Sequence, residues 1–432
     1  MRKIALIICV LACLAACHDD DNDSPSPAQK VSRSVLVYMA AENSLTASQG
    51  VRFMQNDLNE IIEGSKQLTG DQRLFVFIDS MNGSKSKAGT PLLLEVHKGE
   101  ATVVTRYESD FYSCDPAKFK EVVQWVQTNA PANDYGLVLW GHASGWIVSN
   151  DSIAGSRSVT RAYGQDDGVD GSSQGLKWMN ITQMARALEG LQKLEFIFAD
   201  CCNMMCAEVG YELRQATNYL IGSPAEIPGK GAPYEKILPY FYKSGSTMYK
   251  GIIDNYYEYY IQEYRRDSEL KGYSVPLSVI DTRYMPQLAE ATRDVLVKFT
   301  DGYPLYPLAP NLYGNVFYWN FDAPIMYDMR AFIKQNTSEE DFNEWDQVFR
   351  QAVPYHRMSM MWMTIYPYLD FAFKDFTGEE SENGCVSMFI PRNNERYYTS
   401  LFNYIKTFNN FGWNRVVDWG RFGWSAESTY VH

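Results

Sequence analysis

The chain has 432 residues, of which 46% are hydrophobic and 21% are charged, and its net charge is −13. These proportions are globular, and the length is enough for one large domain or two ordinary ones. A strongly acidic chain repels the phosphate backbone, which excludes nucleic-acid binding from the functions considered.

The first segment has the form of an export signal. Arg2 and Lys3 precede an apolar run over residues 4–16, which is too short to cross a bilayer as a helix. The run ends Leu14-Ala15-Ala16-Cys17, which resembles the lipobox of bacterial lipoproteins. We predict a lipoprotein signal peptide over 1–17, with Cys17 as the lipidated residue and the lipid bilayer as a partner. A plain signal peptide cleaved nearby is the alternative.

Residues 18–30 are rich in Asp, Asn, Ser and Pro, which predicts a flexible acidic tether. The acidic residues directly after Cys17 resemble the tag that sends some lipoproteins to the outer cell face. We therefore expect an outer-membrane lipoprotein of the cell envelope, exposed at the surface. A solvated linker is the other interpretation of these charges.

From residue 31 onward, strand patterns alternate with helix patterns. Strands are predicted at 34–40, 74–79, 135–140, 196–200 and 219–223, a hairpin at 92–96 and 102–107, and helices around 57–62, 115–128, 181–191 and 207–217. Such alternation predicts an α/β fold with a mostly parallel central sheet covered on both faces. We assign residues 31–245 to this core. Residues 147–178 are polar and without periodicity, which predicts a long loop.

Beyond residue 245 the pattern is more aromatic and less regular. A helix is predicted to open at Tyr256, a strand at 275–280, an amphipathic helix up to Phe299 and a late strand at 385–391. We expect residues 246–432 to form an α+β extension that packs on the core or completes it.

Five cysteines remain after those of the signal segment: Cys114, Cys201, Cys202, Cys206 and Cys385. An odd number, with three crowded together, is a poor disulfide framework even for an exported protein. At least one free thiol is expected.

Two predicted strands end in residues suited to hydrolysis. One runs into Asp200-Cys201-Cys202 and the other into Gly141-His142. Reactive side chains in open α/β sheets lie just beyond the carboxyl ends of strands. We therefore expect these two strand ends to meet in a cysteine–histidine site. His356 is the reserve histidine, in a setting that looks like surface.

A cysteine nucleophile needs a proton donor for the leaving amine and hydrogen-bond donors for the oxyanion. Cys202 is predicted to start the turn into a helix, whose dipole favours a thiolate, and the amides of Cys202 and Ala143 could hold the oxyanion. Cys201 would point away from the cleft if the chain is extended there. Buried inert cysteines and a packed histidine are the alternative.

The sequence shows no phosphate loop, dinucleotide fingerprint or zinc spacing, and no metal ligands are assigned. Asp166-Asp167-Gly168-Val169-Asp170 could hold calcium, which is the one cofactor considered. An acidic solvated loop is the preferred interpretation of this segment.

Four motifs taken together resemble the clostripain-like cysteine peptidases. They are Tyr38-Met39-Ala40-Ala41-Glu42-Asn43-Ser44-Leu45, Leu139-Trp140-Gly141-His142-Ala143-Ser144-Gly145-Trp146, Asp200-Cys201-Cys202-Asn203-Met204 and the segment from Ser223 to Tyr234. The resemblance implies a caspase-like α/β/α sandwich and cleavage of peptide bonds after Arg or Lys. It also implies Cys202 as the nucleophile and His142 as the general acid.

The same resemblance implies substrate-binding roles. Asp200 matches an acid that shapes the pocket for a basic side chain, Glu226 lies near the second such acid, and Ala143 replaces a glycine beside the histidine. Lys230 stands where an acid is expected, which puts the Arg or Lys preference in question.

Some members of that family cut themselves between the histidine and the cysteine. Arg157, Arg161 and Lys177 are the candidate positions here, and an uncut loop is the alternative. Two rival functions also stay open. One is a non-catalytic lipoprotein whose aromatic side chains bind peptide or glycan, and the other is a degenerate peptidase fold that binds peptides without cutting them.

Overall fold

The structure is a computed structural model. It describes residues 31–46, 50–81, 89–147, 163–168, 176–266, 275–300, 317–320, 324–358, 361–363, 373–375, 382–390 and 411–418. The predicted signal peptide, Cys17 and the tether lie outside these residues.

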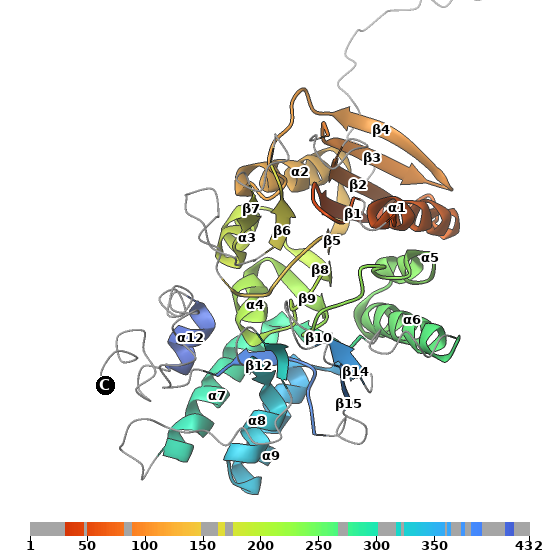
Figure 1. Cartoon of the computed structure of the whole chain (residues 1–432). Coiled ribbons are helices and arrows are strands. Elements are labelled where there is room, and N and C mark those ends of the chain that lie inside the picture. Colours follow the sequence, from red (N-terminus) through yellow and green to blue (C-terminus); the bar gives the residue numbers. More distant parts are fainter. Residues whose placement is uncertain are drawn as a thin grey trace, which may run out of the picture.

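A nine-stranded sheet, in the order β13-β10-β9-β8-β5-β1-β2-β3-β4, forms the centre of the molecule (Figure 1). Its five middle strands are parallel: β1 (Val31–Ala41), β2 (Gln72–Ser80), β5 (Ala132–Trp140), β8 (Leu194–Asp200) and β9 (Thr217–Gly222). Two antiparallel strands extend each edge: β3 (Leu92–His97) and β4 (Glu100–Arg106) at one, β10 (Leu277–Asp281) and β13 (Tyr355–Arg357) at the other. The predicted parallel core sheet is confirmed.

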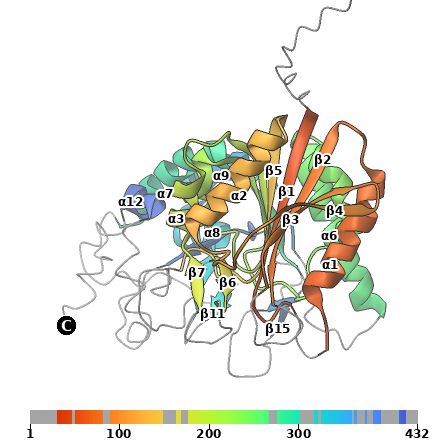
Figure 2. The same ribbon diagram turned by 90° about the horizontal axis from the view of Figure 1, so that it is seen from above.

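Helices cover both faces of this sheet, as Figures 1 and 2 show. Even-numbered side chains of β1, such as Leu36 and Tyr38, pack towards one face, and Val35 and Val37 pack towards the other. The first face is covered by α2 (Pro116–Asn129), α3 (Ile181–Leu188), α4 (Ala207–Glu212), α7 (Met285–Thr300), α8 (Met329–Asn336), α9 (Glu339–Ala352) and α12 (Gly412–Val417). The second face is covered by α1 (Phe53–Gly64), α5 (Tyr234–Ile237) and α6 (Gly245–Arg266). This alternation, with period two along the strand, produces the predicted α/β/α sandwich.

Three small sheets complete the described structure. They are β6 (Tyr163–Asp166) with β7 (Lys177–Met179), β11 (Phe317–Asn320) with β12 (Pro324–Asp328) and β16 (Ser387–Phe389), and β14 (Met361–Met363) with β15 (Phe373–Asp375). Single 3-10 turns lie at η1 (Ser65–Gln67), η2 (Leu213–Gln215), η3 (Leu238–Tyr242) and η4 (Thr282–Tyr284).

Two sequence predictions need correction. Part of the predicted loop 147–178 forms the β6–β7 pair, whose strands of four and three residues are too short to show an apolar period. The aromatic helix begins at Gly245 and not at Tyr256. Its buried face includes Met248, Ile252, Tyr256 and Tyr260, which recur at every fourth position. Only the two tyrosines stand out in the aromatic sequence, so the first half of the helix was missed.

The segments beyond residue 245 are joined to the core by strands and hydrogen bonds. β10 pairs with β9 in the main sheet, and the amide of Ser387 donates to the carbonyl of Met205 at 3.0 Å. Many of the large aromatic side chains placed there are buried, among them Tyr256, Tyr318 and Trp413, whereas Tyr257, Tyr259 and Tyr355 are half-buried. The buried ones fill the core, which accounts for much of the aromatic content of this region without a binding platform.

Among the described residues, none of the helices is long and apolar enough to cross a bilayer.

Candidate active site

The register of the sheet brings the predicted histidine and cysteine to one edge. β5 and β8 are parallel neighbours, and Trp140 at the end of β5 pairs with Asp200 at the end of β8. His142 and Cys202 each follow two residues later. Parallel strands in register deliver their next residues to the same edge, so His142 and Cys202 both lie at this edge of the sheet.

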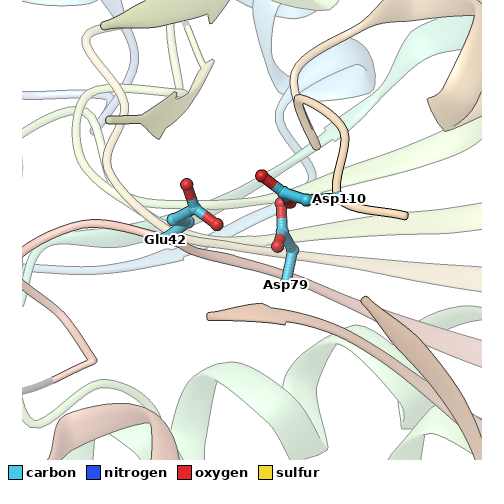
Figure 3. Close-up of side chains that lie close together, drawn as sticks. All are labelled: Glu42, Asp79 and Asp110. Carbon is cyan, nitrogen blue, oxygen red and sulfur yellow. The ribbon is translucent and has the colours of Figure 1, made fainter. Parts of the chain in front are cut away.

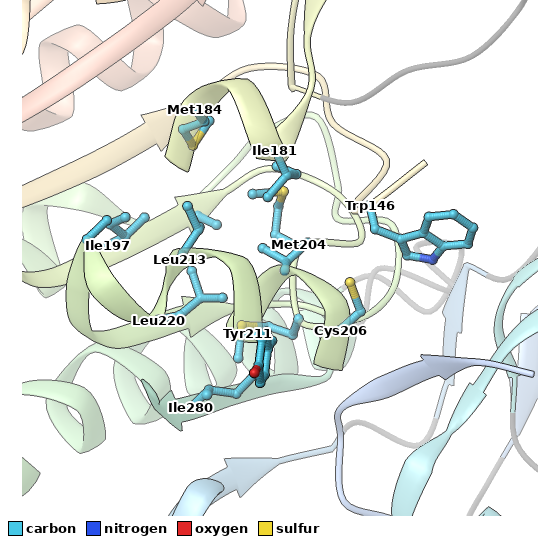
Figure 4. Packing of buried hydrophobic residues seen from close by; sticks show 14 of the residues in the cluster. Trp146, Ile181, Met184, Ile197, Met204, Cys206, Tyr211, Leu213, Leu220 and Ile280 are labelled. Carbon is cyan, nitrogen blue, oxygen red and sulfur yellow. The ribbon is translucent and has the colours of Figure 1, made fainter. Parts of the chain in front are cut away.

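The two turns after these strands also touch each other. Gly145 has φ of +67°, and a Cβ on it would lie 2.5 Å from the carbonyl oxygen of Asn203. Only a glycine allows this approach between the histidine turn and the cysteine turn. Trp146, Met204 and Cys206 pack behind them in the same buried cluster (Figure 4).

His142 is half-buried and held from two directions. Its Nε2 lies 3.0 Å from the Oγ of Ser44, in the turn after β1. Its carbonyl accepts a hydrogen bond of 2.9 Å from the amide of Gly164 in β6. This bond belongs to the isolated bridge between Ala143 and Tyr163. Its acceptor is the carbonyl of His142, and the amide of Ala143 does not take part in it.

Cys202 is the half-buried cysteine of the described chain, and its Sγ accepts a hydrogen bond of 3.4 Å from the amide of Ile227. The other described cysteines, Cys114, Cys201, Cys206 and Cys385, are free and buried. Burial raises the pKa of the Cys201 thiol well above its usual range, and a buried thiol is unreactive. Cys201 packs in the core as predicted.

The expected helix dipole at Cys202 is wrong. α4 begins at Ala207, with Cys206 at its N-cap, and Cys206 forms a bridge with Ser387. The chain between Cys202 and the helix is an irregular turn in which Asn203 has φ of +61°. The field of the helix ends decays within about one turn, so it contributes little at Cys202.

Asp200 is buried and fully hydrogen-bonded. Its Oδ2 accepts from the amide of Ala232 at 3.1 Å and from the Tyr234 hydroxyl at 2.8 Å, and its Oδ1 accepts from the Tyr256 hydroxyl at 3.2 Å. Burial raises the pKa of Asp200 to about 6, and these three bonds oppose the rise. The side chain is 3% exposed. The carboxylate of Asp200 is therefore enclosed by its three protein donors.

A pocket of about 640 Å³ lies over this buried acid. It is lined by Val51, Phe53, Asn56, Asp57, Asn59, Glu60, Gly229, Lys230, Tyr260 and Glu263. Asp57 lines the pocket and lies close to Asp200. The two carboxylates meet beside Gly231, where a Cβ would lie 2.8 Å from Oδ2 of Asp57 and 3.0 Å from Oδ2 of Asp200. Burial and the charge of Asp200 raise the pKa of Asp57 to about 9, while a hydrogen bond of 2.6 Å from Trp140 opposes the rise.

Lys230 is the basic side chain of this pocket. Its Nζ lies 3.3 Å from Glu263 and 4.8 Å from the ring centre of Tyr259. Glu226 is half-buried and directly precedes Ile227, the donor to Cys202. The structure thus places Glu226 next to the cysteine and Lys230 in the pocket.

The remaining predicted residues lie elsewhere. His356 is on β13, three strands away from β8, so it does not reach the site. Lys177 is half-buried at the start of β7 and pairs with Asp166, whereas Arg157 and Arg161 lie outside the described residues. Asp166 is 1% exposed, so the acidic segment is not a solvated loop at that residue, and Asp170 is not described.

Sequence reasoning missed Ser44 and Asp57. Ser44 stands in one of the motifs that carry the family resemblance, but its contact with His142 depends on the chain path after β1. Asp57 reads as a polar position on a surface helix, yet it is 1% exposed. An acid on the buried face of α1 was the available signal.

A sequence model of the clostripain family matches residues 37–424 of the chain. Among solved structures, a secreted C11 cysteine protease from Bacteroides thetaiotaomicron, in complex with an irreversible peptide inhibitor, is 28% identical with a TM-score of 0.71. An inactive zymogen C11 protease from Parabacteroides distasonis is 24% identical, with a TM-score of 0.70. Each alignment covers 90% of this chain and 99% of the other. No curated protein matches the chain.

The family match spans the strands, the cysteine and histidine turns and the pocket, and the first of these structures shares the fold along nearly its whole length. The chain belongs to the clostripain family and is a cysteine peptidase.

Proposed function

We propose that Cys202 and His142 are the catalytic pair of an exported, lipid-anchored endopeptidase that cleaves after arginine or lysine. The observation that carries the pair is the register of β5 and β8, in which Trp140 and Asp200 are partners and each catalytic residue follows two positions later. The half-buried state of Cys202 beside four buried cysteines supports the same choice.

In the proposed reaction the Cys202 thiolate attacks the scissile carbonyl carbon and forms a C–S bond. The amides of Cys202 and Ala143 donate to the oxyanion while His142 gives a proton to the leaving amine as the C–N bond breaks. Water then hydrolyses the thioester and restores the thiol. The contact between Ser44 and Nε2 of His142 would hold the imidazole ring in place.

The preference for a basic residue is proposed from the acidic pocket. Asp57, Glu60 and Glu263 line it, and Asp200 lies beneath. Lys230 already contacts Glu263, so a substrate side chain would have to displace it or share that acid. Glu226, next to the donor of Cys202, is the proposed second acid near the cleaved bond.

Export and anchoring are proposed from the N-terminal sequence. The apolar run and the lipobox ending in Cys17 support a lipid anchor, and the acidic residues that follow support exposure at the surface of the outer membrane. The 28% identical protein from Bacteroides thetaiotaomicron is described as secreted. Protease treatment of intact cells tests the surface location, which would be refuted if the protein survived unshaved.

The catalytic pair is tested with Cys202→Ala, His142→Ala and, as the matched control, Cys201→Ala. A thiol-directed arginyl or lysyl affinity label and a peptide library are incubated with each protein. We expect labelling and cleavage by wild type and Cys201→Ala, and at least a thousandfold loss of cleavage in the other two. Equal cleavage by wild type and Cys202→Ala would refute the nucleophile.

Self-processing is proposed at Arg157, Arg161 or Lys177. Lys177 is paired in β7, so cleavage there would require the β6–β7 pair to open. Electrophoresis of purified wild type and Cys202→Ala tests this idea, because a self-cut chain gives two fragments in the first protein only. A single chain in both would dismiss it.

A further inference from the structure

Asn203, the residue after Cys202, has a backbone conformation that few residues other than glycine adopt. Its φ is +61°, in the left-handed region. Among the non-glycine residues that the structure describes, only Lys98, Cys385 and Asp418 also have a positive φ. The left-handed region brings Cβ close to the backbone in every residue except glycine, and Asn and Asp tolerate it better than most.

Ordinary turn geometry explains two of the other three positions but not Asn203. Lys98 stands with Gly99 in the two-residue turn between β3 and β4, and Asp418 directly follows the last residue of α12. A left-handed residue is usual at both kinds of place. Asn203 instead lies between β8 and α4, three residues before the N-cap residue Cys206. Strained backbone of this kind is concentrated at functional sites, so its contacts are informative.

The neighbouring segments hold Asn203 on both sides of its α-carbon. Its amide donates a hydrogen bond of 2.9 Å to the carbonyl of Ala225, in the segment after β9. Its carbonyl oxygen lies against Gly145 of the histidine turn, so closely that a Cβ on Gly145 would be 2.5 Å away. A right-handed or extended φ would point this carbonyl elsewhere while the amide stayed bound to Ala225. The left-handed conformation therefore joins the cysteine turn to the histidine turn.

The side chain of Asn203 offers no competing explanation. The residue is 5% exposed, and its Oδ1 is buried without a hydrogen-bond partner in the described part of the chain. A buried acceptor without a donor is unfavourable, so a side chain kept for its hydrogen bonds would be expected to have one. The property of Asn that this position uses is its tolerance of the left-handed region.

The same turn carries the proposed nucleophile. The Sγ of Cys202 accepts a hydrogen bond of 3.4 Å from the amide of Ile227, and the amide of Asn203 is bound two residues earlier, at Ala225. One short segment thus holds both residues. Because the turn is fixed there, a different φ at Asn203 must displace either Cys202 or the contact with Gly145.

We propose that Asn203 is a positioning residue, whose left-handed backbone sets the distance between Cys202 and His142. This role rests on the proposed catalytic pair. Asn203 takes no proton and contacts no substrate atom in the proposed reaction, and it acts through its carbonyl on Gly145, three residues after His142. A displacement of about 1 Å between reacting groups can lower a rate about a hundredfold, so this contact has a large effect on catalysis.

The test compares Asn203→Ala with Asn203→Gly in the full chain. Glycine adopts the left-handed region without strain, whereas alanine lacks the tolerance of Asn. For Asn203→Ala we expect kcat for an arginyl or lysyl peptide to fall at least about tenfold, with KM within about twofold of wild type. Asn203→Gly should keep kcat within about threefold of wild type, although it also lacks the side-chain amide.

Asp418→Ala is the matched control. Asp tolerates the left-handed region as Asn does, and Asp418 has φ of +59° at the end of α12, outside the proposed site. Both alanine substitutions should lower the melting temperature by about 2–4 °C, because both put alanine under the same strain. Asp418→Ala should leave kcat unchanged.

Three results would overturn the proposal. Equal losses of kcat in Asn203→Ala and Asn203→Gly would mean that the side-chain amide is the group that matters. Unchanged kcat in Asn203→Ala, whatever its melting temperature, would show that the conformation serves the fold alone. A change confined to KM would assign Asn203 to substrate binding.

A readout without substrate separates this proposal from the catalytic pair on which it rests. Iodoacetamide alkylates thiolates, and the buried cysteines should react slowly, so Cys202→Ala should abolish the fast labelling. We expect Asn203→Ala to be labelled about three- to tenfold more slowly than wild type and Asn203→Gly, since a displaced imidazolium stabilises the thiolate less. Fast labelling retained in Cys202→Ala would refute the nucleophile. Fast labelling of Cys202 in Asn203→Ala would overturn only the role of Asn203.

Discussion

Two groups of buried acids lie at the same edge of the central sheet, and they are treated in opposite ways. The pocket group, Asp57 and Asp200, receives hydrogen bonds from Trp140, Ala232 and two tyrosines. The carboxylate oxygens of Glu42, Asp79 and Asp110 (Figure 3) have no close and well-aligned donor in the described chain, although weaker contacts with the backbone of Gly89 and Phe111 favour the charged forms of Glu42 and Asp110. Asp110 is also half-buried, whereas the other four acids are buried. The two groups therefore differ in how many well-formed hydrogen bonds they receive.

The pKa values follow the number of donors and not the group, because Asp57, with one side-chain donor, has a pKa of about 9 like Glu42. Asp200 is wholly enclosed, yet its pKa rises only to about 6 because three donors favour the carboxylate. The pKa of Glu42 rises to about 9 through burial and the charges of neighbouring acids. Donors, more than depth, decide whether a buried carboxyl group is stable in its ionised form.

Replacement of Asp200 by Asn should have the largest effect on stability. Asn offers one acceptor oxygen and turns an NH₂ group towards donors that already point at the site, so at least one buried donor loses its partner. We expect a loss of about 2–4 kcal/mol in the free energy of unfolding. Denaturant unfolding measures it, with Asp71→Asn, an acid at a strand end that is fully exposed, as the control. A loss below about 1 kcal/mol would remove the distinction between the two groups.

A pH effect is predicted for Asp57. Its pKa of about 9 in the folded protein exceeds that of the unfolded chain, so the folded state binds a proton that the unfolded state releases. The resulting stability is complete below about pH 4 and is lost as the pH rises towards 9. Between pH 6 and 8 we expect a loss of about 2 kcal/mol, measured as the difference from Asp57→Asn, which cannot titrate. Parallel curves for the two proteins would contradict this assignment.

The sequence was sufficient for the parallel core and for the placement of His142 and Cys202 just beyond the carboxyl ends of two strands, while their catalytic pairing stays a prediction. Apolar runs of strand length mark the strands, and parallel strands must deliver their ends to one edge. It was insufficient where function depends on register across strands that are distant in sequence. The predicted strand 74–79 ends at Asp79, but the approach of this acid to Glu42 and Asp110 depends on the β1–β2 register and on the path between β4 and α2.

The start of α4 illustrates a second limit. The helix predicted at 207–217 does begin at Ala207, but the turn before it forms a bridge between Cys206 and Ser387, about 180 residues away in sequence, which separates Cys202 from the helix end. A local pattern of apolar residues does not reveal a bridging partner so far away in the sequence. The same holds for Asp200, whose donors Tyr234 and Tyr256 come from two later helices.

Asp79→Asn should affect stability in the opposite direction from Asp200→Asn. Burial and the neighbouring acids hold the pKa of Asp79 well above its usual range, and its carboxyl group hydrogen-bonds Asp166, so Asn replaces a protonated group with a neutral one that can still donate. We expect the protein to be as stable as wild type or more stable by about 1 kcal/mol. Asp166→Asn is the matched control and should destabilise, because Asp166 loses bonds from Ser113 and Gly168. Equal destabilisation by both would show that Asp79 has donors in solution.

The smallest predicted effect concerns Lys230. Its replacement compares the acidic pocket with and without the basic side chain that the protein itself supplies. Lys230 is half-exposed and pairs with Glu263 at 3.3 Å, so its pairing contributes less than about 1 kcal/mol. Lys230→Met keeps the length of the side chain but frees Glu263 for a substrate. We expect KM for peptides with arginine or lysine before the cleaved bond to fall about two- to fivefold, with kcat unchanged, since Lys230 has no part in the proposed bond-breaking steps. Lys236→Met, which removes the neighbouring cation over the ring of Tyr259, is the control and should leave KM unchanged. A rise in KM for Lys230→Met would mean that Lys230 itself binds the substrate, through an acidic or carbonyl group, and the pocket would then select against basic side chains.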